Sequence, residues 1–122
     1  MTGDTIPPRI LLRTRCQSGF DQFEEQSAYL SREVVEFLSD KGVRLIGMDT
    51  SSVDAVCSKT LDAHHTLISR GMLWLENLDL TAVREGNYFL SALPLKLMEL
   101  EAAPVRAVLM TFNSDEPRRS PC

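Results

Sequence analysis

The only two histidines of this 122-residue chain are adjacent, at His64 and His65. The surrounding stretch SKTLDAHHTLISRGMLWLEN, residues 58–77, also holds the single tryptophan, Trp74, and places Glu76 in an apolar run. An imidazole and a carboxylate are both common zinc ligands. An ionised carboxylate among apolar residues is costly unless it meets a cation. These residue types therefore suggest the hypothesis that a histidine and Glu76 share a metal site.

A short helix must position the histidine pair. The pattern predicts a helix over residues 61–70, which Gly71 can end. Because residues three and four apart share a helix face, His64 is expected within an apolar stripe that points inward. This stripe consists of Leu61, His64, Leu67 and Ile68. His65 is rotated by about 100° and is expected at the margin of that face.

A strand must position Glu76. Residues 72–80 read as a strand that is buried on both faces, with Trp74 and Glu76 on the same face. The chain can reverse at Gly71, which would bring His64 and Glu76 close together. The alternative is structural: a core histidine bonded to a backbone carbonyl, and a glutamate paired with a basic side chain. The candidates for that basic partner are Arg44, Lys96 and Arg106.

Two ligands do not complete a zinc site, which takes about four. Further candidates are Asp49, Asp54 and Asp62, each of which is more often a cap or loop residue. Cys57 is a candidate soft ligand, although a small, partly buried thiol is the commoner role. Asp62 and the loop at 50–52 are also candidates for orienting ligands or substrate. No catalytic residue is assigned from the sequence.

The N-terminal half predicts a strand, a helix and a second strand. The first strand is expected over residues 9–14 and the second, a buried one, over 43–50. Between them, Ser31 is a plausible N-cap, Gly42 is a natural stop, and apolar residues recur at helical spacing. That predicted apolar face consists of Leu30, Val34, Phe37 and Leu38. Two strands joined in this way are most simply parallel, so residues 49–58 leave a carboxyl end, where sites are common.

The C-terminal half adds two strand candidates, at residues 86–97 and 104–112, with Pro94 indicating an edge or a bulge in the first. The expected fold class is α/β, with a mixed β-sheet and two or more packed helices. The expected organisation is a lead-in over residues 1–8, one domain over 9–112, and a disordered polar tail over 113–122.

The composition of the chain argues against two classes of binding partner, nucleic acids and membranes. A net charge of −4, without a basic stripe, argues against a nucleic-acid surface. No apolar run is long enough to span a bilayer, so no membrane partner is expected, and the first residues do not have the pattern of a signal peptide. The three cysteines are widely spaced and include no Cys-x-x-Cys pair, which favours a reduced, cytoplasmic location over a disulfide framework.

A family resemblance emerges from an ordered set of motifs. After RILLRT, the chain contains GVRLIGMDTSSVD, SKTLDAHH, WLENL, ALPLKL and APVRAVL, together spanning roughly Arg9 to Met110. The set resembles bacterial kynurenine formamidase, the metal-dependent arylformamidase of the cyclase family. It favours this branch over the polyketide-cyclase-like and isatin-hydrolase relatives.

The resemblance implies a hydrolase that removes formate from N-formyl-L-kynurenine in tryptophan catabolism, the kynurenine pathway. It implies a swivelling β/β/α fold, a pair of divalent metals that are usually zinc, and a homodimer. A family metal-binding histidine and a glutamate twelve residues later match His64 and Glu76. The resemblance therefore supports a metal role for these two residues.

One departure from the family is large. These 122 residues contain no His-x-Gly-Thr-His-x-Asp-x-Pro motif, which supplies most of the family's metal ligands. The chain thus resembles only the C-terminal half of the enzyme, and exposed strand edges or apolar surface are expected where the rest would pack. Three hypotheses follow: a formamidase whose site is completed by another chain or segment, a catalytically inactive truncated relative, and a remnant that binds metal or a partner without hydrolysis.

Overall fold

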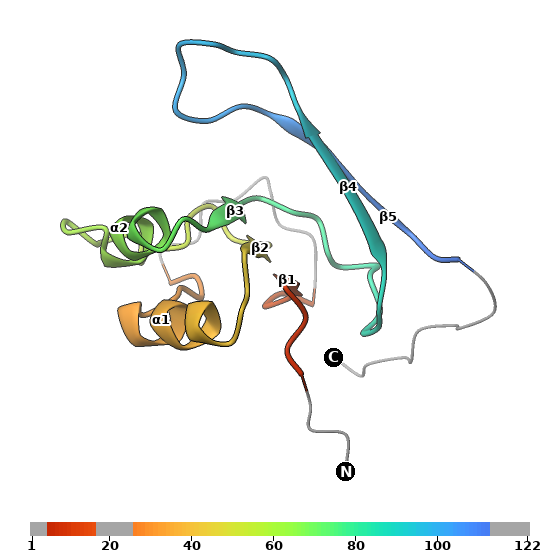
Figure 1. Cartoon of the computed structure of the whole chain (residues 1–122), viewed down its shortest axis with the longest axis horizontal. Coiled ribbons are helices and arrows are strands. Elements are labelled where there is room, and N and C mark those ends of the chain that lie inside the picture. The colour runs from red at the N-terminus through yellow and green to blue at the C-terminus, as the bar shows by residue number, and fades with distance from the viewer. Residues whose placement is uncertain (1–4, 17–25, 113–122) are drawn as a thin grey trace. The chain divides into compact units, whose positions relative to one another are not determined.

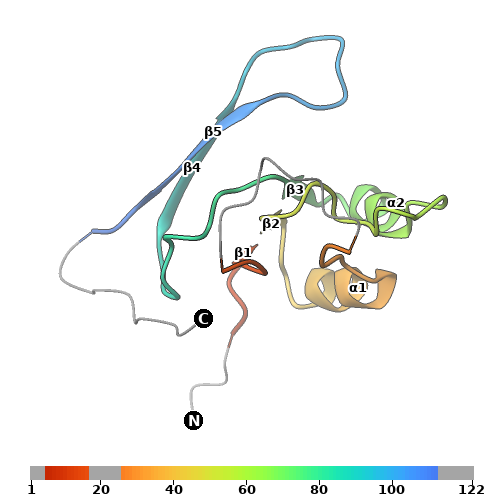
Figure 2. The same ribbon diagram turned by 180° about the vertical axis from the view of Figure 1, so that it is seen from behind.

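The computed structural model describes residues 5–16 and 26–112. It divides the chain into two compact units, Met1–Ala82 and Val83–Cys122, whose ribbons are drawn from opposite sides in Figures 1 and 2. Because the two units are not placed relative to one another, each is described by itself. The expectation of a single domain over 9–112 stays a prediction, and the expected tail at 113–122 lies outside the described residues.

The first unit is built on a three-stranded parallel sheet. Strands β1 (Arg9–Leu12), β2 (Leu45–Met48) and β3 (Leu73–Leu75) lie in the order β1-β2-β3. The central strand pairs in parallel with both neighbours, with Leu45 opposite Arg9 on one side and opposite Leu73 on the other. The predicted parallel arrangement is confirmed. All three carboxyl ends consequently meet at one edge of the sheet.

Helix α1 (Arg32–Asp40) connects β1 to β2 and begins as predicted. The Oγ of Ser31 accepts a hydrogen bond from Val34 N at 3.3 Å, and Gly42, at φ +89°, follows the end of the helix. The predicted inward face was wrong for two residues, because Val34 and Phe37 are 43% and 53% exposed. Val35 is fully buried instead. Solvent exposure of Phe37 is compatible with its ring lying 5.6 Å from Lys41 Nζ.

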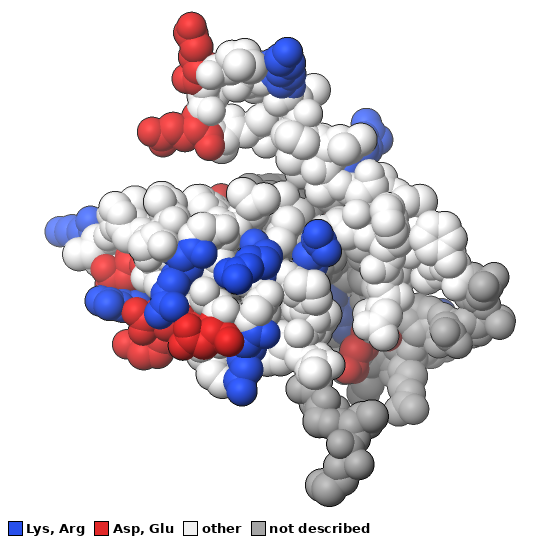
Figure 3. Space-filling view, viewed as in Figure 1, with Lys and Arg blue, Asp and Glu red and all other residues white. Residues whose placement is uncertain are grey.

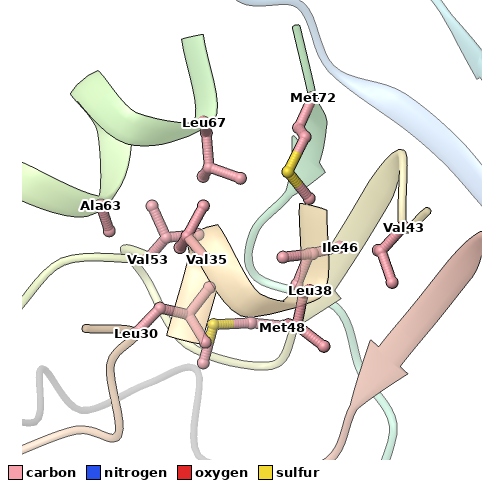
Figure 4. Close-up of a cluster of buried hydrophobic side chains, with 10 residues drawn as sticks. All are labelled: Leu30, Val35, Leu38, Val43, Ile46, Met48, Val53, Ala63, Leu67 and Met72. Atoms are coloured by element: carbon pink, nitrogen blue, oxygen red, sulfur yellow. The ribbon is translucent and has the colours of Figure 1, made fainter. Parts of the chain in front are cut away.

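The core of this unit lies between the helices and one face of the sheet. Both helices, α1 and α2 (Asp62–Ser69), lie on the same side of the strands in the two ribbon views. Figure 4 shows the buried side chains that fill the space between them. The cluster consists of Leu30, Val35, Leu38, Val43, Ile46, Met48, Val53, Ala63, Leu67 and Met72. Burying a large aliphatic side chain stabilises a fold by about 1.5–3 kcal/mol, so this cluster fixes both helices on the sheet.

The middle of β2 has no space for a side chain on the opposite face. A Cβ atom added to Gly47 would come within 2.7 Å of Leu78 Cδ1 and closer still to Leu11 Cδ2. The leucine side chains of the flanking segments therefore pack directly over the central strand. This face is less covered farther along, where Leu73 of β3 is 68% exposed. The expectation that residues 72–80 are buried on both faces was wrong for Leu73.

The second unit contains an antiparallel pair of strands, β4 (Phe89–Pro94) and β5 (Val105–Met110). Phe89 lies opposite Met110, and Pro94, the last residue of β4, lies opposite Val105. A two-stranded sheet has only edge strands, so Pro94 is tolerated there. The α/β fold class is confirmed. Within the described residues, the parallel and antiparallel pairs belong to separate sheets.

The outer surface of the helices carries charges of both signs. Figure 3 shows acidic and basic side chains next to one another over α1 and α2. Arg32 Nε lies 2.9 Å from Glu36 Oε1, and Arg70 Nη1 lies 2.9 Å from Asp40 Oδ1. Exposed pairs of this kind contribute about 0–1 kcal/mol each. Neither helix in the described part of the chain has the length and apolar character needed to cross a bilayer.

Candidate metal centre

The start of α2 is capped from a distance. Leu61, at the N-cap position, has a φ of 50° and makes no side-chain capping bond. Asp54 supplies the cap instead: its Oδ1 accepts from Ala63 N at 2.8 Å, and its Oδ2 accepts from His64 N at 3.0 Å. The Oγ of Ser58 accepts from Leu61 N at 3.1 Å and supports the turn before the helix. The carboxylate that caps the helix thus comes from the loop that leaves β2.

The same carboxylate contacts the His64 ring. Asp54 Oδ2 lies 2.6 Å from His64 Nδ1. The ring also packs edge-on against Trp74, with centroids 5.3 Å apart and an interplanar angle of 87°. The His64 side chain is 24% exposed, and His65 is exposed. Two fixed neighbours therefore orient the imidazole that the helical spacing predicted to point inward.

Only part of the predicted apolar stripe on this helix is buried. Leu67 and Ala63 are fully buried and Thr66 is nearly so, but Leu61 and Ile68 are 43% and 63% exposed. The helix is rotated from the predicted orientation because Asp54 and the α1 contacts fix it against the sheet. His64 consequently lies at the border of the core, with Nδ1 facing Asp54 and Nε2 facing Glu76.

Glu76 directly follows β3 at the carboxyl edge of the sheet. Its Oε1 accepts a hydrogen bond from Val53 N at 3.0 Å and lies 3.5 Å from His64 Nε2. The Glu76 side chain is 27% exposed. The chain reversal after α2 does bring the histidine and the glutamate together. Of the ionic partners weighed for Glu76, His64 is the one found, since the described contacts pair it with none of the three basic candidates.

Asp54 is held in its ionised form by its hydrogen bonds. Burial alone would raise the pKa of Asp54, but the bonds from the His64 side chain, His64 N and Ala63 N outweigh it. The net result is a pKa below the ordinary value for an aspartate. The group facing Nδ1 is therefore a carboxylate whose oxygens act as acceptors.

The other acidic candidates have different roles. Asp49 is buried and accepts from Thr14 N, Thr14 Oγ1 and Arg15 N at 2.6–2.9 Å, so it fixes the segment after β1. Asp62 is exposed at the first position of α2, and its backbone oxygen accepts from Thr66. Asp54, and not Asp62, is the residue that contacts His64. The only signal in the sequence was its place in the loop at the carboxyl end of a strand.

Neither of the two described cysteines is found in this cluster. Cys57 is a free and exposed thiol, not a partly buried one as expected. Cys16 is disulfide-bonded, which departs from the expectation of reduced thiols. Across residues 5–16 and 26–112, no three side chains of His, Cys, Asp or Glu form a group that could hold a metal ion. His64 and Glu76 are thus two neighbouring donors and not a complete set.

Known proteins are similar to much of this chain. The family model Cyclase, described as "Putative cyclase", matches residues 2–55. The kynurenine formamidase of Bordetella petrii is 46% identical over 106 residues, which cover 87% of this chain and 51% of that protein. The kynurenine formamidase of Delftia acidovorans is 52% identical over 106 residues, which cover 85% and 49%.

The chain resembles the bacterial kynurenine formamidases. It spans about half the length of these curated relatives, as its lack of the second histidine motif led us to expect. Two solved structures, one described as a predicted metal-dependent hydrolase from Bacillus stearothermophilus and one as a potential metal-dependent hydrolase with cyclase activity, share its fold. Their TM-scores are 0.67 and 0.68, each with 35% identity, and the matches cover 73% of this chain and 43–44% of those proteins. The resemblance to the cyclase-type hydrolases is confirmed.

Proposed function

We propose that this chain supplies His64 and Glu76 as ligands of a divalent metal in a formamidase-type amide hydrolase. The observation that carries the proposal is the 3.5 Å separation of His64 Nε2 and Glu76 Oε1 at the carboxyl edge of the sheet. Nε2 is the ring nitrogen left for a ligand, because Nδ1 is already bonded to Asp54. The similarity to kynurenine formamidases and to metal-dependent hydrolases supports the same assignment.

The chemistry of this donor pair fits a cation. When Nδ1 carries the ring proton, Nε2 presents a lone pair, and the carboxylate oxygen opposite presents another. Two lone pairs that face each other repel unless a cation or a proton lies between them. Histidine nitrogen and carboxylate oxygen are both zinc ligands. A metal-binding histidine usually donates its other ring N–H to a carboxylate or a carbonyl oxygen, as His64 can to Asp54.

The residues of this chain would hold the metal and orient its ligands, and none of them is assigned to proton transfer. His64 and Glu76 would bind the metal, Asp54 would hold the imidazole, and Val53 N would hold the glutamate. We propose zinc in a two-metal site, as the family resemblance implies. When bound, such a metal lowers the pKa of a coordinated water and polarises a carbonyl oxygen. The proposed substrate is N-formyl-L-kynurenine, cleaved to kynurenine and formate in tryptophan catabolism.

We propose that the remaining ligands come from outside these 122 residues. The chain spans about half of its relatives, and the described residues provide two neighbouring donors where zinc takes about four. We therefore propose that a partner polypeptide bearing the His-x-Gly-Thr-His-x-Asp-x-Pro segment, or a second subunit in a homodimer, completes the site. A cytoplasmic location is part of the proposal, and the disulfide at Cys16 is the observation that weighs against it.

The test measures zinc binding and hydrolysis separately. Zn²⁺ is titrated into the purified chain and into Glu76→Gln, both in a Cys57→Ser background that removes the exposed free thiol. Formate release from N-formyl-L-kynurenine is then measured for the chain alone and together with a polypeptide that carries the missing motif. We expect weak zinc binding that Glu76→Gln reduces, no turnover by the chain alone, and turnover in the mixture.

Other outcomes would select the alternatives. Zinc binding through Glu76 without turnover in any mixture would indicate a remnant that binds metal or a partner. Equal zinc binding by the chain and by Glu76→Gln would rule out the half-site formed by His64 and Glu76, and would favour an inactive truncated relative. Turnover by the chain alone that disappears in Glu76→Gln would mean that copies of this chain complete the site among themselves.

A further inference from the structure

A single side chain connects the loop after β2, the start of α2 and the ring of His64. Asp54 is 4% exposed and accepts three hydrogen bonds, of which two come from backbone N–H groups and one involves His64 Nδ1. Its Oδ2 serves both the backbone and the ring of the same histidine, at 3.0 and 2.6 Å. The orientation of the ring is therefore fixed relative to the first turn of the helix.

This geometry selects one tautomer of the imidazole. A backbone N–H can only donate, so both oxygens of Asp54 are already used as acceptors by Ala63 N and His64 N. A bare lone pair on Nδ1 at 2.6 Å from an accepting oxygen would be repelled. Nδ1 must consequently donate its hydrogen to Oδ2. In the neutral ring the lone pair is then on Nε2, which lies toward Glu76.

We propose that Asp54 is the positioning residue of the half-site, holding His64 in the Nδ1–H tautomer so that Nε2 is available beside Glu76. The edge-on contact with Trp74 further limits rotation of the His64 ring. The inference about the tautomer stands on the contacts alone. Its consequence for metal affinity rests on the proposed function, in which Nε2 and Glu76 Oε1 are ligands.

Asp49 provides a matched control within the same chain. Both aspartates follow β2, both are nearly inaccessible, with exposures of 2% and 4%, and both accept backbone N–H groups. The described contacts of Asp49 are to Thr14 and Arg15, not to the histidine. A role confined to stability would make Asp49→Asn and Asp54→Asn behave alike. A positioning role would make Asp54→Asn reduce zinc affinity far more than Asp49→Asn does.

The first measurement needs no change at Asp54. The chain has two histidines, so His65→Gln leaves His64 as the only imidazole, and its ring nitrogens are resolved by long-range ¹H–¹⁵N correlation at about pH 8.5, where an ordinary imidazole is neutral. We expect a protonated Nδ1 in the metal-free chain, whether or not Nε2 also carries a proton. A protonated Nε2 with an unprotonated Nδ1 would overturn the inference. In Asp54→Asn, whose amide can also donate to Nδ1, we expect a mixed or reversed tautomer.

The second measurement is Zn²⁺ affinity in the Cys57→Ser background. We expect Asp54→Asn to weaken zinc binding about 10- to 100-fold, as loss of a residue that holds a metal-binding histidine does, and Asp49→Asn to change it less than about threefold. Asp54→Ser, which can still cap the helix with its hydroxyl, is expected to weaken it similarly. Unchanged affinity in both Asp54 variants, with affinity lost in Glu76→Gln, would overturn the positioning role but leave the proposed function. Zinc binding unaffected by Glu76→Gln would contradict the proposed function. The inference about the His64 tautomer would then be decided by the ¹H–¹⁵N measurement alone.

Discussion

Val53 N donates a hydrogen bond to Glu76 Oε1 across 3.0 Å, joining the loop after β2 to the residue that follows β3. The next residue in that loop, Asp54, holds the ring of His64. Two consecutive residues thus orient both proposed ligands, one through its backbone and the other through its side chain. The 3.5 Å separation of His64 Nε2 and Glu76 Oε1 is a consequence of this arrangement.

The substitution Glu76→Gln should weaken metal binding without destabilising the fold. Glutamine keeps an oxygen that can accept from Val53 N, so we expect the free energy of unfolding to change by less than about 1 kcal/mol. The lost negative charge should weaken Zn²⁺ binding at least about tenfold, because removing even a residue that only holds a metal ligand in place has that effect. Urea denaturation and zinc titration of the same preparation provide both numbers. A large loss of stability would mean that the carboxylate is primarily structural.

Leu67→Ala should destabilise the first unit strongly. Leu67 is fully buried on α2 in the cluster of Figure 4, and truncating a buried leucine costs about 2–5 kcal/mol. Ile68→Ala on the same helix is the control, because Ile68 is 63% exposed. Chemical denaturation should show a change below about 1 kcal/mol for the control. Equal effects of the two substitutions would contradict the orientation of α2 described here.

Gly47→Ala should destabilise by overpacking, not by backbone strain. The added Cβ would meet the side chains of Leu11 and Leu78 on either side of the central strand. Overpacking a filled site costs about 1–3 kcal/mol. Thermal unfolding of the variant should show the loss, and a second substitution, Leu78→Ala, should lessen the clash. If the double variant is less stable than the sum of the two single changes predicts, the contact is not the cause.

Ser31→Ala tests the start of α1. The Oγ of Ser31 accepts from Val34 N, and removing an N-cap of this type costs about 0.5–2 kcal/mol. The matched change is Ser51→Ala, at an exposed position in the loop after β2, which should alter the unfolding free energy by less than about 0.5 kcal/mol. Urea denaturation monitored by circular dichroism compares the two. Indistinguishable midpoints would show that the cap contributes nothing measurable.

The elements were predictable because their signals are local. Ser31 and Gly42 mark the limits of α1 within one turn of its ends, and the buried pattern of β2 lies within four consecutive residues. The strand-helix-strand order then allows few arrangements, of which the parallel one is found. The same locality allowed His64 and Glu76 to be selected together, since a helix, a glycine and a short strand are all that separate them.

Which face of each helix is buried was less predictable from the sequence. Val34 and Val35 are chemically identical and adjacent, and the periodicity favoured the one that is 43% exposed. For Asp49, Asp54 and Asp62, the residue types alone are equivalent. Their roles differ because one meets the segment after β1, another meets His64, and the third is exposed at the helix start.

By itself, the sequence determined the α/β class, the parallel order of the first strands, the family resemblance and the proximity of His64 and Glu76. Only the tertiary structure decided that Asp54 caps α2 and holds the His64 ring, and that Val53 N holds Glu76. The physical reason is that no regular helix or strand spacing relates these residues, whereas a helix, a glycine and a short strand relate His64 to Glu76. These contacts join residues 10 and 23 positions apart, and their geometry depends on how the loop after β2 crosses the carboxyl edge of the folded sheet.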